Sequence, residues 1–150
     1  MPADNDLIQL YSKRILALAA DIPLTEPLEA CDGSAKRRSP LCGSTVTACV
    51  GMEGGAIAAF SQDVKACALG QASASVLGGA VIGKSRKDIA EARDGLKAML
   101  KEGAEPPGGA FEALEVLSPA KDYKNRHASI LLAWDATLDA IDQAAEAKAV

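Results

Sequence analysis

The sequence contains no Cys-x-x-Cys pair, and that absence removes the strongest signatures of zinc fingers and of thioredoxin-like redox sites. Its four cysteines, at positions 31, 42, 49 and 67, are widely spaced, and we expect them to be reduced thiols. An excess of positive charge is also missing, since 16 lysines and arginines face 20 aspartates and glutamates. An acidic chain lacks the broad basic surface that phosphate backbones require, so nucleic acid is not an expected partner.

Signals for export or membrane insertion are absent as well. The N-terminus has no basic segment, and Ser12, Lys13 and Arg14 interrupt the first apolar stretch. We therefore expect neither a signal peptide nor a membrane span, and we expect a cytoplasmic protein. Because the chain has 150 residues and no internal repeat, it is expected to form one domain over residues 1–150.

The first half of the chain changes from a helical pattern to a strand pattern. Asn5 or Asp6 can cap a first helix that ends before Pro23, and prolines at 23 and 27 then predict a rigid connector. Alternation predicts strands at 36–39, 45–52 and 56–64, with a hairpin turn at 53–55. These strands predict a small antiparallel meander.

The second half of the chain is helical. Ser85 and Asp88 form a capping-box pattern that starts a helix ending before Gly103. A loop at 105–109 and a short packed turn at 111–117 precede a last helix at about 123–147. Strands followed by helices predict an α+β fold, in which a small three-stranded antiparallel sheet carries helices packed on one face.

Cys67 opens a helix of unusually small residues and is the strongest functional signal in the sequence. A thiol in the first turn of a helix faces unpaired amide N–H groups and the positive end of the helix dipole. Both favour the thiolate, which is the nucleophilic and metal-binding form. A buried structural cysteine is the alternative interpretation.

The predicted fold also places the other cysteines. The loop at Cys42 and the helix start at Cys67 can meet at one end of the sheet, whereas Cys31 is carried toward the far end of the first strand. Cys49 lies within a strand, where we expect it to pack against a neighbour.

Four segments resemble the U-type iron–sulfur cluster scaffold family, which comprises IscU, SufU and the N-terminal domain of NifU. They are the opening helix Tyr-Ser-Lys-Arg-Ile-Leu, the loop Ser-Pro-Leu-Cys-Gly around Cys42, the block Val-Lys-Ala-Cys-Ala-Leu-Gly-Gln-Ala-Ser-Ala-Ser around Cys67, and Leu-Ala-Trp-Asp-Ala in the last helix. The block around Cys67 is the most specific and is closest to SufU. The resemblance covers nearly the whole chain and implies the SufE/NifU-like, IscU-like fold.

The resemblance implies a site of three cysteines plus an aspartate or a histidine. Cys42 and Cys67 match two of the family's cysteines, but Ser44 stands where the family has its aspartate and Ser129 where it has its third cysteine. A serine hydroxyl is a far poorer ligand for zinc or iron than a thiolate or carboxylate. His127, one residue before the position of the IscU histidine, could complete a metal site with Cys42 and Cys67 if the start of the last helix is shifted or loosened.

Three functions follow from the resemblance. The first is an iron–sulfur cluster assembly protein that binds iron, zinc or a transient cluster and accepts sulfur from a cysteine desulfurase through Cys42 and Cys67. It would not be an enzyme in the turnover sense, and its partners would be the desulfurase and recipient apoproteins. The second is a zinc-dependent SufU-like sulfurtransferase in which Cys67 or Cys42 leaves the metal to attack a persulfide. The third is a metal-free interaction protein that has lost the cluster site.

One further segment, residues 117–121, resembles the sequence by which IscU engages its Hsp70 chaperone. The connection to the last helix is longer here, at 122–125. A loop stopped by Pro119 is therefore the preferred interpretation.

Overall fold

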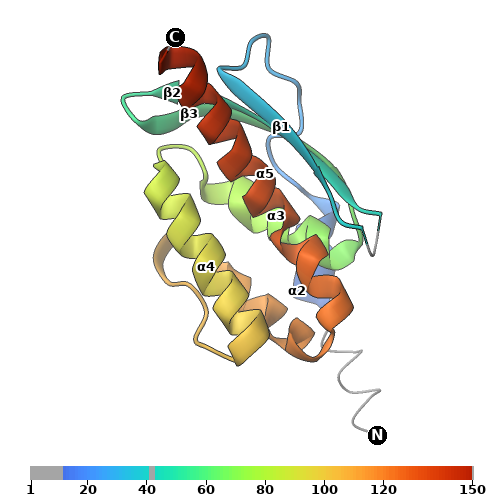
Figure 1. The fold of residues 1–150 in the computed structure, drawn as a ribbon. Coiled ribbons are helices and arrows are strands. Elements are labelled where there is room, and N and C mark those ends of the chain that lie inside the picture. Colours follow the sequence, from blue (N-terminus) through green and yellow to red (C-terminus); the bar gives the residue numbers. More distant parts are fainter. Residues whose placement is uncertain (1–11, 41–42, 150) are drawn as a thin grey trace, which may run out of the picture.

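A three-stranded antiparallel sheet forms one layer of the molecule, and helices cover one of its faces (Figure 1). The computed structural model describes residues 12–40 and 43–149. The strands lie in the order β1-β2-β3. The elements, in chain order, are α2 (Lys13–Ala20), β1 (Gly33–Arg38), β2 (Thr45–Glu53), β3 (Ala56–Lys65), α3 (Ala68–Ala80), α4 (Arg86–Glu102), the 3-10 helix η1 (Gly109–Asp122) and α5 (Lys124–Ala149). This is the predicted α+β fold.

Strand β2 is the centre of the sheet, and its two faces differ. Val46, Ala48 and Val50 are buried against the helices, whereas the residues between them are only partly buried. The turn from β2 to β3 is formed by Gly54 and Gly55, whose positive φ angles of 60° and 81° suit a two-residue hairpin turn. The meander and its turn are therefore confirmed.

Strand β1 begins at Gly33, three residues earlier than the predicted start. A Cβ atom at Gly33 would overlap the backbone of α5 at Ala140 and Ala144. The glycine lets α5 lie directly against the edge of the sheet (Figure 1). Arg37 of the same strand forms an ion pair with Asp139 of α5. The strand start is thus set by the contact with α5 rather than by local strand propensity.

Helix α4 has the predicted boundaries. Ser85 and Asp88 complete the capping box, and Gly103 ends the helix with a left-handed φ of 72°. Residues 117–121 differ from the prediction, because they belong to η1 rather than to a loop. Leu117 and Ala120 of this segment are buried, so the binding of a chaperone here would require the segment to leave the core.

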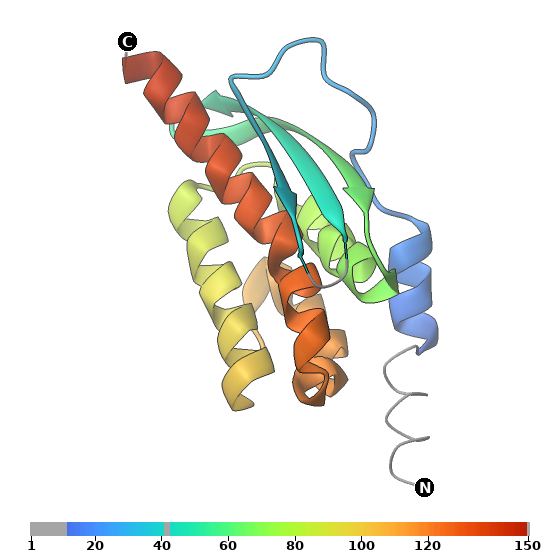
Figure 2. The same ribbon diagram turned by 45° about the vertical axis from the view of Figure 1, so that its right-hand side comes forward.

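The connection from α2 to β1, residues 21–32, is here called the linker. It runs from α2 past the sheet on the side away from α5 (Figure 2). The backbone N–H of Gln62 in β3 donates to the carbonyl of Leu24 at 2.9 Å. The hydroxyl of Ser61 donates to the carbonyl of Glu26 at 2.7 Å. The linker is therefore bound to the outer face of the sheet.

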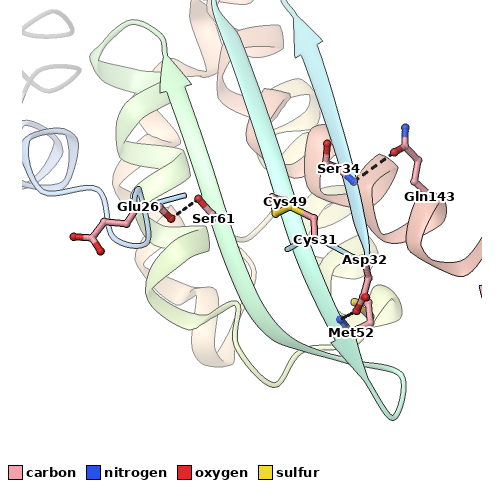
Figure 3. Close-up of a disulfide and its surroundings, with 8 residues drawn as sticks. All are labelled: Glu26, Cys31, Asp32, Ser34, Cys49, Met52, Ser61 and Gln143. Atoms are coloured by element: carbon pink, nitrogen blue, oxygen red, sulfur yellow. Dashed lines mark hydrogen bonds between the residues drawn. A yellow bond between two sulfur atoms is a disulfide. The ribbon is translucent and has the colours of Figure 1, made fainter. Parts of the chain in front are cut away.

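Two of the four cysteines form a disulfide, which corrects the expectation of reduced thiols. Cys31, in the linker, is bonded to Cys49 in β2 (Figure 3). Cys49 therefore does not simply pack against an apolar neighbour. Among the described residues Cys67 is the free cysteine.

No helix in the described part of the chain has the length and apolar character needed to cross a membrane.

Candidate functional site

Cys67 is the N-cap residue of α3, two residues after the end of β3. Its backbone is extended, with φ of -68° and ψ of 169°, and the helix begins at the next residue. The side chain is partly buried. The prediction that this cysteine opens a helix is therefore confirmed.

Two serine hydroxyls lie beside the thiol. Ser129 Oγ, from α5, is 3.6 Å from Cys67 Sγ. Ser44 Oγ, from the residue before β2, is 3.1 Å from Ser129 Oγ. Both serines are almost fully buried, with exposed fractions of 4% for Ser44 and 1% for Ser129. The structure thus joins three distant segments at one end of the sheet, as the family resemblance implied for these three residues.

Gly70 makes this junction sterically possible. A Cβ atom at this position would lie 2.7 Å from Ser129 Oγ and 3.1 Å from the Ser129 carbonyl oxygen. One turn further along α3, the Ser73 hydroxyl donates to the carbonyl of Ile130 at 2.6 Å and accepts from Trp134 Nε1 at 2.9 Å. Small residues on α3 therefore let α5 approach closely and hold Ser129 beside Cys67.

The surroundings of Cys67 favour its thiolate. Burial acts to raise the pKa of the thiol, but several contacts outweigh it. The amide N–H of Gly70 has the largest opposing effect, followed by the Ser129 hydroxyl, the amide of Leu69 and the positive charge of Arg126. The net result is a pKa below the ordinary value for a cysteine. The amides act through their orientation at the helix start, without a hydrogen bond of capping geometry.

A pocket of about 430 Å³ opens beside the thiol. It is lined by Cys67 and Ser44 together with Gly43, Lys65, Ala66, Asn125 and Arg126. The two charged side chains in this lining, Lys65 and Arg126, are both cationic. The sequence reasoning missed both of them. Their positions in the sequence could have indicated them. Lys65 stands two residues before Cys67, and Arg126 stands on the same face of α5 as Ser129.

His127 lies apart from this pocket. Its side chain is 1% exposed, and its Nε2 is 2.9 Å from the carbonyl oxygen of Ala120 in η1. Its Nδ1 is buried and has no hydrogen-bond partner among the described residues. Residues two apart in sequence point about 200° apart around an α-helix, so the side chain of His127 faces away from that of Ser129. A role as metal ligand would require the first turn of α5 to loosen, and it stays a prediction.

Cys42 lies outside the described residues, so its predicted approach to Cys67 also stays a prediction. The donors that the described residues bring together are one thiol and two hydroxyls. Alcohol oxygens are poor ligands for zinc and iron, which prefer thiolate, imidazole and carboxylate. These three residues alone therefore do not fit a four-coordinate metal. No group of three His, Cys, Asp or Glu side chains suited to a metal occurs in the parts of the chain described here.

The architecture matches that of solved structures. A nitrogen-fixing NifU-like protein (N-terminal) from Brucella abortus is 43% identical, with a TM-score of 0.91 over 94% of this chain and 98% of that chain. The chain therefore belongs to the U-type iron–sulfur cluster assembly scaffold family.

A second match shows the same fold at lower identity. The protein described as an iron–sulfur cluster assembly scaffold for the SUF system of Fervidobacterium islandicum AW-1 is 22% identical, with a TM-score of 0.77 over 86% of this chain and 94% of that chain. No protein-family model matches the sequence, and no curated protein matches it.

Proposed function

We propose that this protein accepts sulfur at Cys67 from a cysteine desulfurase, as its part in iron–sulfur cluster assembly. The observation that supports the proposal is the Cys67 thiol at the start of α3, with its pKa lowered by amides, a hydroxyl and a cation. Family membership supports the context of cluster assembly. The desulfurase and the recipient apoproteins are the partners that this function needs.

The proposed reaction is a thiol exchange on a persulfide. The Cys67 thiolate attacks the terminal sulfur of the persulfide on the desulfurase cysteine. The S–S bond of the desulfurase persulfide breaks, and its electron pair stays on the desulfurase cysteine, which leaves as a thiolate. Cys67 then carries the persulfide, and the exchange requires no oxidant or reductant.

The pocket suits the product of this exchange. A persulfide on Cys67 is one atom longer than the thiol and is anionic, and it would extend from the thiol toward Lys65 and Arg126. The Ser129 hydroxyl, 3.6 Å from Sγ, can donate to the sulfur. Charge-assisted hydrogen bonds of this kind are stronger than neutral ones. The replacement of metal ligands by serines is compatible with a sulfur-accepting site.

In the second candidate function, the same site would carry iron, zinc or a transient cluster as its cargo. It would be held by Cys67 and Cys42, with His127 or a partner's thiol as a further ligand. Membership of the scaffold family supports this candidate. The described donor set supports it less than it supports sulfur acceptance, because two of its three groups are hydroxyls.

Mass spectrometry after mixing with a cysteine desulfurase and cysteine under anaerobic conditions tests the proposal. Cys67 is the only cysteine of residues 66–84, the tryptic segment between Lys65 and Lys84. We expect this segment to gain the mass of one sulfur atom, and we expect the gain to be lost in Cys67→Ser. The variant Cys42→Ser is the matched control and should still be modified.

An unmodified segment 66–84, in an experiment that modifies an intact U-type protein in parallel, would contradict the proposal. The metal-free interaction protein would then be the better account. Metal content after anaerobic purification separates the metal-carrying candidate from the metal-free sulfur acceptor and from the metal-free interaction protein.

A further inference from the structure

The disulfide between Cys31 and Cys49 lies on the face of the sheet that the helices leave uncovered (Figure 3). Cys49 is on the central strand, between the inward-facing residues Ala48 and Val50. Cys31 is exposed and belongs to the linker, and Cys49 is partly buried. The bond therefore joins a surface segment to the centre of the sheet, at a place that solvent reaches.

A cleft of about 630 Å³ lies between the linker and the sheet. Both cysteines line it, together with Pro27 and Leu28 of the linker and Asp63 of β3. This cleft shares no lining residue with the pocket at Cys67. An attacking thiol can therefore approach the disulfide without passing the proposed sulfur-accepting site.

The disulfide also lies between two sets of linker anchors. On one side, Leu24 and Glu26 are bound to β3 through their carbonyl groups. On the other side, the N–H of Asp32 donates to the Val50 carbonyl, and the Asp32 carboxylate accepts from the N–H of Met52.

Between these anchors, the structure gives residues 27–30, all of them described, no hydrogen bond to the sheet. The disulfide is therefore the link that holds this stretch, and we expect the stretch to respond to its reduction.

We propose that Cys31–Cys49 is a thiol–disulfide exchange site, which a dithiol reductant opens to free residues 27–31 of the linker. The incoming thiolate attacks Sγ of the exposed Cys31, and the bond to Cys49 breaks with its electron pair on Cys49. The second thiol of the reductant then attacks the mixed disulfide and releases Cys31. The reductant becomes a disulfide, and its two protons end on Cys31 and Cys49.

The linker connects this site with the helices. The hydroxyl of Ser75 in α3 donates to the carbonyl of Asp21 at 3.4 Å. The side-chain amide of Gln62 donates to the carbonyl of Ala74 in α3 at 2.9 Å and to the carbonyl of Pro23 at 3.4 Å. These anchors lie at the other end of the linker, so we expect opening to remain local and to leave α3 in place.

The test uses the full chain, equilibrated anaerobically with graded ratios of reduced to oxidised dithiothreitol and then alkylated. In the oxidised protein, tryptic segments 15–36 and 39–65 should be joined, and they should remain joined in Cys42→Ser, which excludes a bond to Cys42. Under native conditions dithiothreitol should separate them. A thioredoxin-type dithiol protein is the second arm, and it tests whether a protein reductant fits the cleft.

Hydrogen exchange of the linker reads out the opening. The amide of Asp32, whose N–H donates to the Val50 carbonyl at 2.8 Å, should exchange about tenfold faster after reduction, because a crosslink at the preceding residue restrains local opening. Amides of α3 and α5 should keep their rates. The variant Cys31→Ser should reproduce the reduced state, whereas Cys67→Ser should retain the full response.

Three results would overturn the proposal. They are free Cys31 and Cys49 thiols in protein never exposed to reductant, a disulfide that only denaturant makes reducible, and linker exchange that reduction leaves unchanged. The wild-type measurements decide the question even if Cys31→Ser does not fold. Reduction by dithiothreitol but not by the dithiol protein supports exchange with small dithiols and contradicts exchange with a protein reductant.

Discussion

Removing the Ser129 hydroxyl should make Cys67 react more slowly at neutral pH. The hydroxyl lies 3.6 Å from Cys67 Sγ and is one of the groups that lower the pKa of this thiol. In Ser129→Ala the burial that raises the pKa remains, while one opposing contact is lost. The pKa of Cys67 should therefore rise, and less thiolate should be present at neutral pH.

The size of the effect follows from the value of hydrogen bonds to charged groups, about 1.5 to 3 kcal/mol. The distance from Sγ to Oγ is long, which places this contact at the low end of that range. About 1.4 kcal/mol corresponds to a tenfold change in an equilibrium constant. A thiolate of higher pKa is intrinsically more nucleophilic, with a Brønsted coefficient of about 0.4 to 0.5, which offsets part of the loss of thiolate. We therefore expect the alkylation of Cys67 to slow about three- to fourfold at pH values below its pKa.

The assay is the rate of iodoacetamide labelling of segment 66–84 as a function of pH, read by mass spectrometry. Ser75→Ala is the matched control, because Ser75 lies on the same helix and its hydroxyl donates to Asp21 rather than to the thiol. Equal rates in Ser129→Ala and the wild type, over the whole pH range, would refute the reasoning. A fold that stays intact by circular dichroism is needed for either conclusion.

Three further changes test the packing and chemistry around the site. Gly70→Ala should destabilise the protein by about 1 to 3 kcal/mol in urea unfolding, because its Cβ would lie 2.7 Å from Ser129 Oγ; unchanged stability would show that α3 and α5 can separate freely. Ser73→Ala should cost about 1 to 3 kcal/mol, because it leaves the buried Trp134 Nε1 without its acceptor, and an equally stable variant would argue against this hydrogen bond. Ser44→Asp combined with Ser129→Cys should raise zinc affinity steeply, since it adds a carboxylate and a thiolate. Calorimetric titration measures the change, and a wild type that binds zinc equally firmly would show that another residue completes the site.

Local rules explain which parts of the fold the sequence predicted correctly. The start of α3 at Cys67 and the capping box of Ser85 and Asp88 depend on neighbouring residues alone. The same holds for the Gly54–Gly55 turn, whose positive φ angles only glycine adopts at no steric cost. The family resemblance added the position of Ser44 and Ser129 beside Cys67, which no local rule could provide.

Features set by distant contacts were missed. Gly33 and Ser34 have weak strand propensity, and they extend β1 because α5 lies against Gly33. The disulfide depends on the register that places Cys49 opposite Ser34, near the end of the linker. Cysteine spacing alone does not reveal such a pairing. The 3-10 helix η1 takes the place of both the short packed turn predicted at 111–117 and the loop predicted at 117–121. Pro119 indicates a break in the sequence, but the buried Leu117 and Ala120 belong to the helix.

The pH dependence of sulfur transfer tests the central claim most directly. A single-turnover reaction between a persulfide-loaded desulfurase and this protein would be followed on segment 66–84 over a range of pH. If the Cys67 thiolate is the sulfur acceptor, the transfer rate should rise with the same midpoint as the alkylation of Cys67, and both midpoints should move to higher pH together in Ser129→Ala. Transfer of sulfur to another segment of Cys67→Ser at the wild-type rate would contradict the account. A transfer rate whose midpoint Ser129→Ala leaves in place while alkylation shifts would also contradict it.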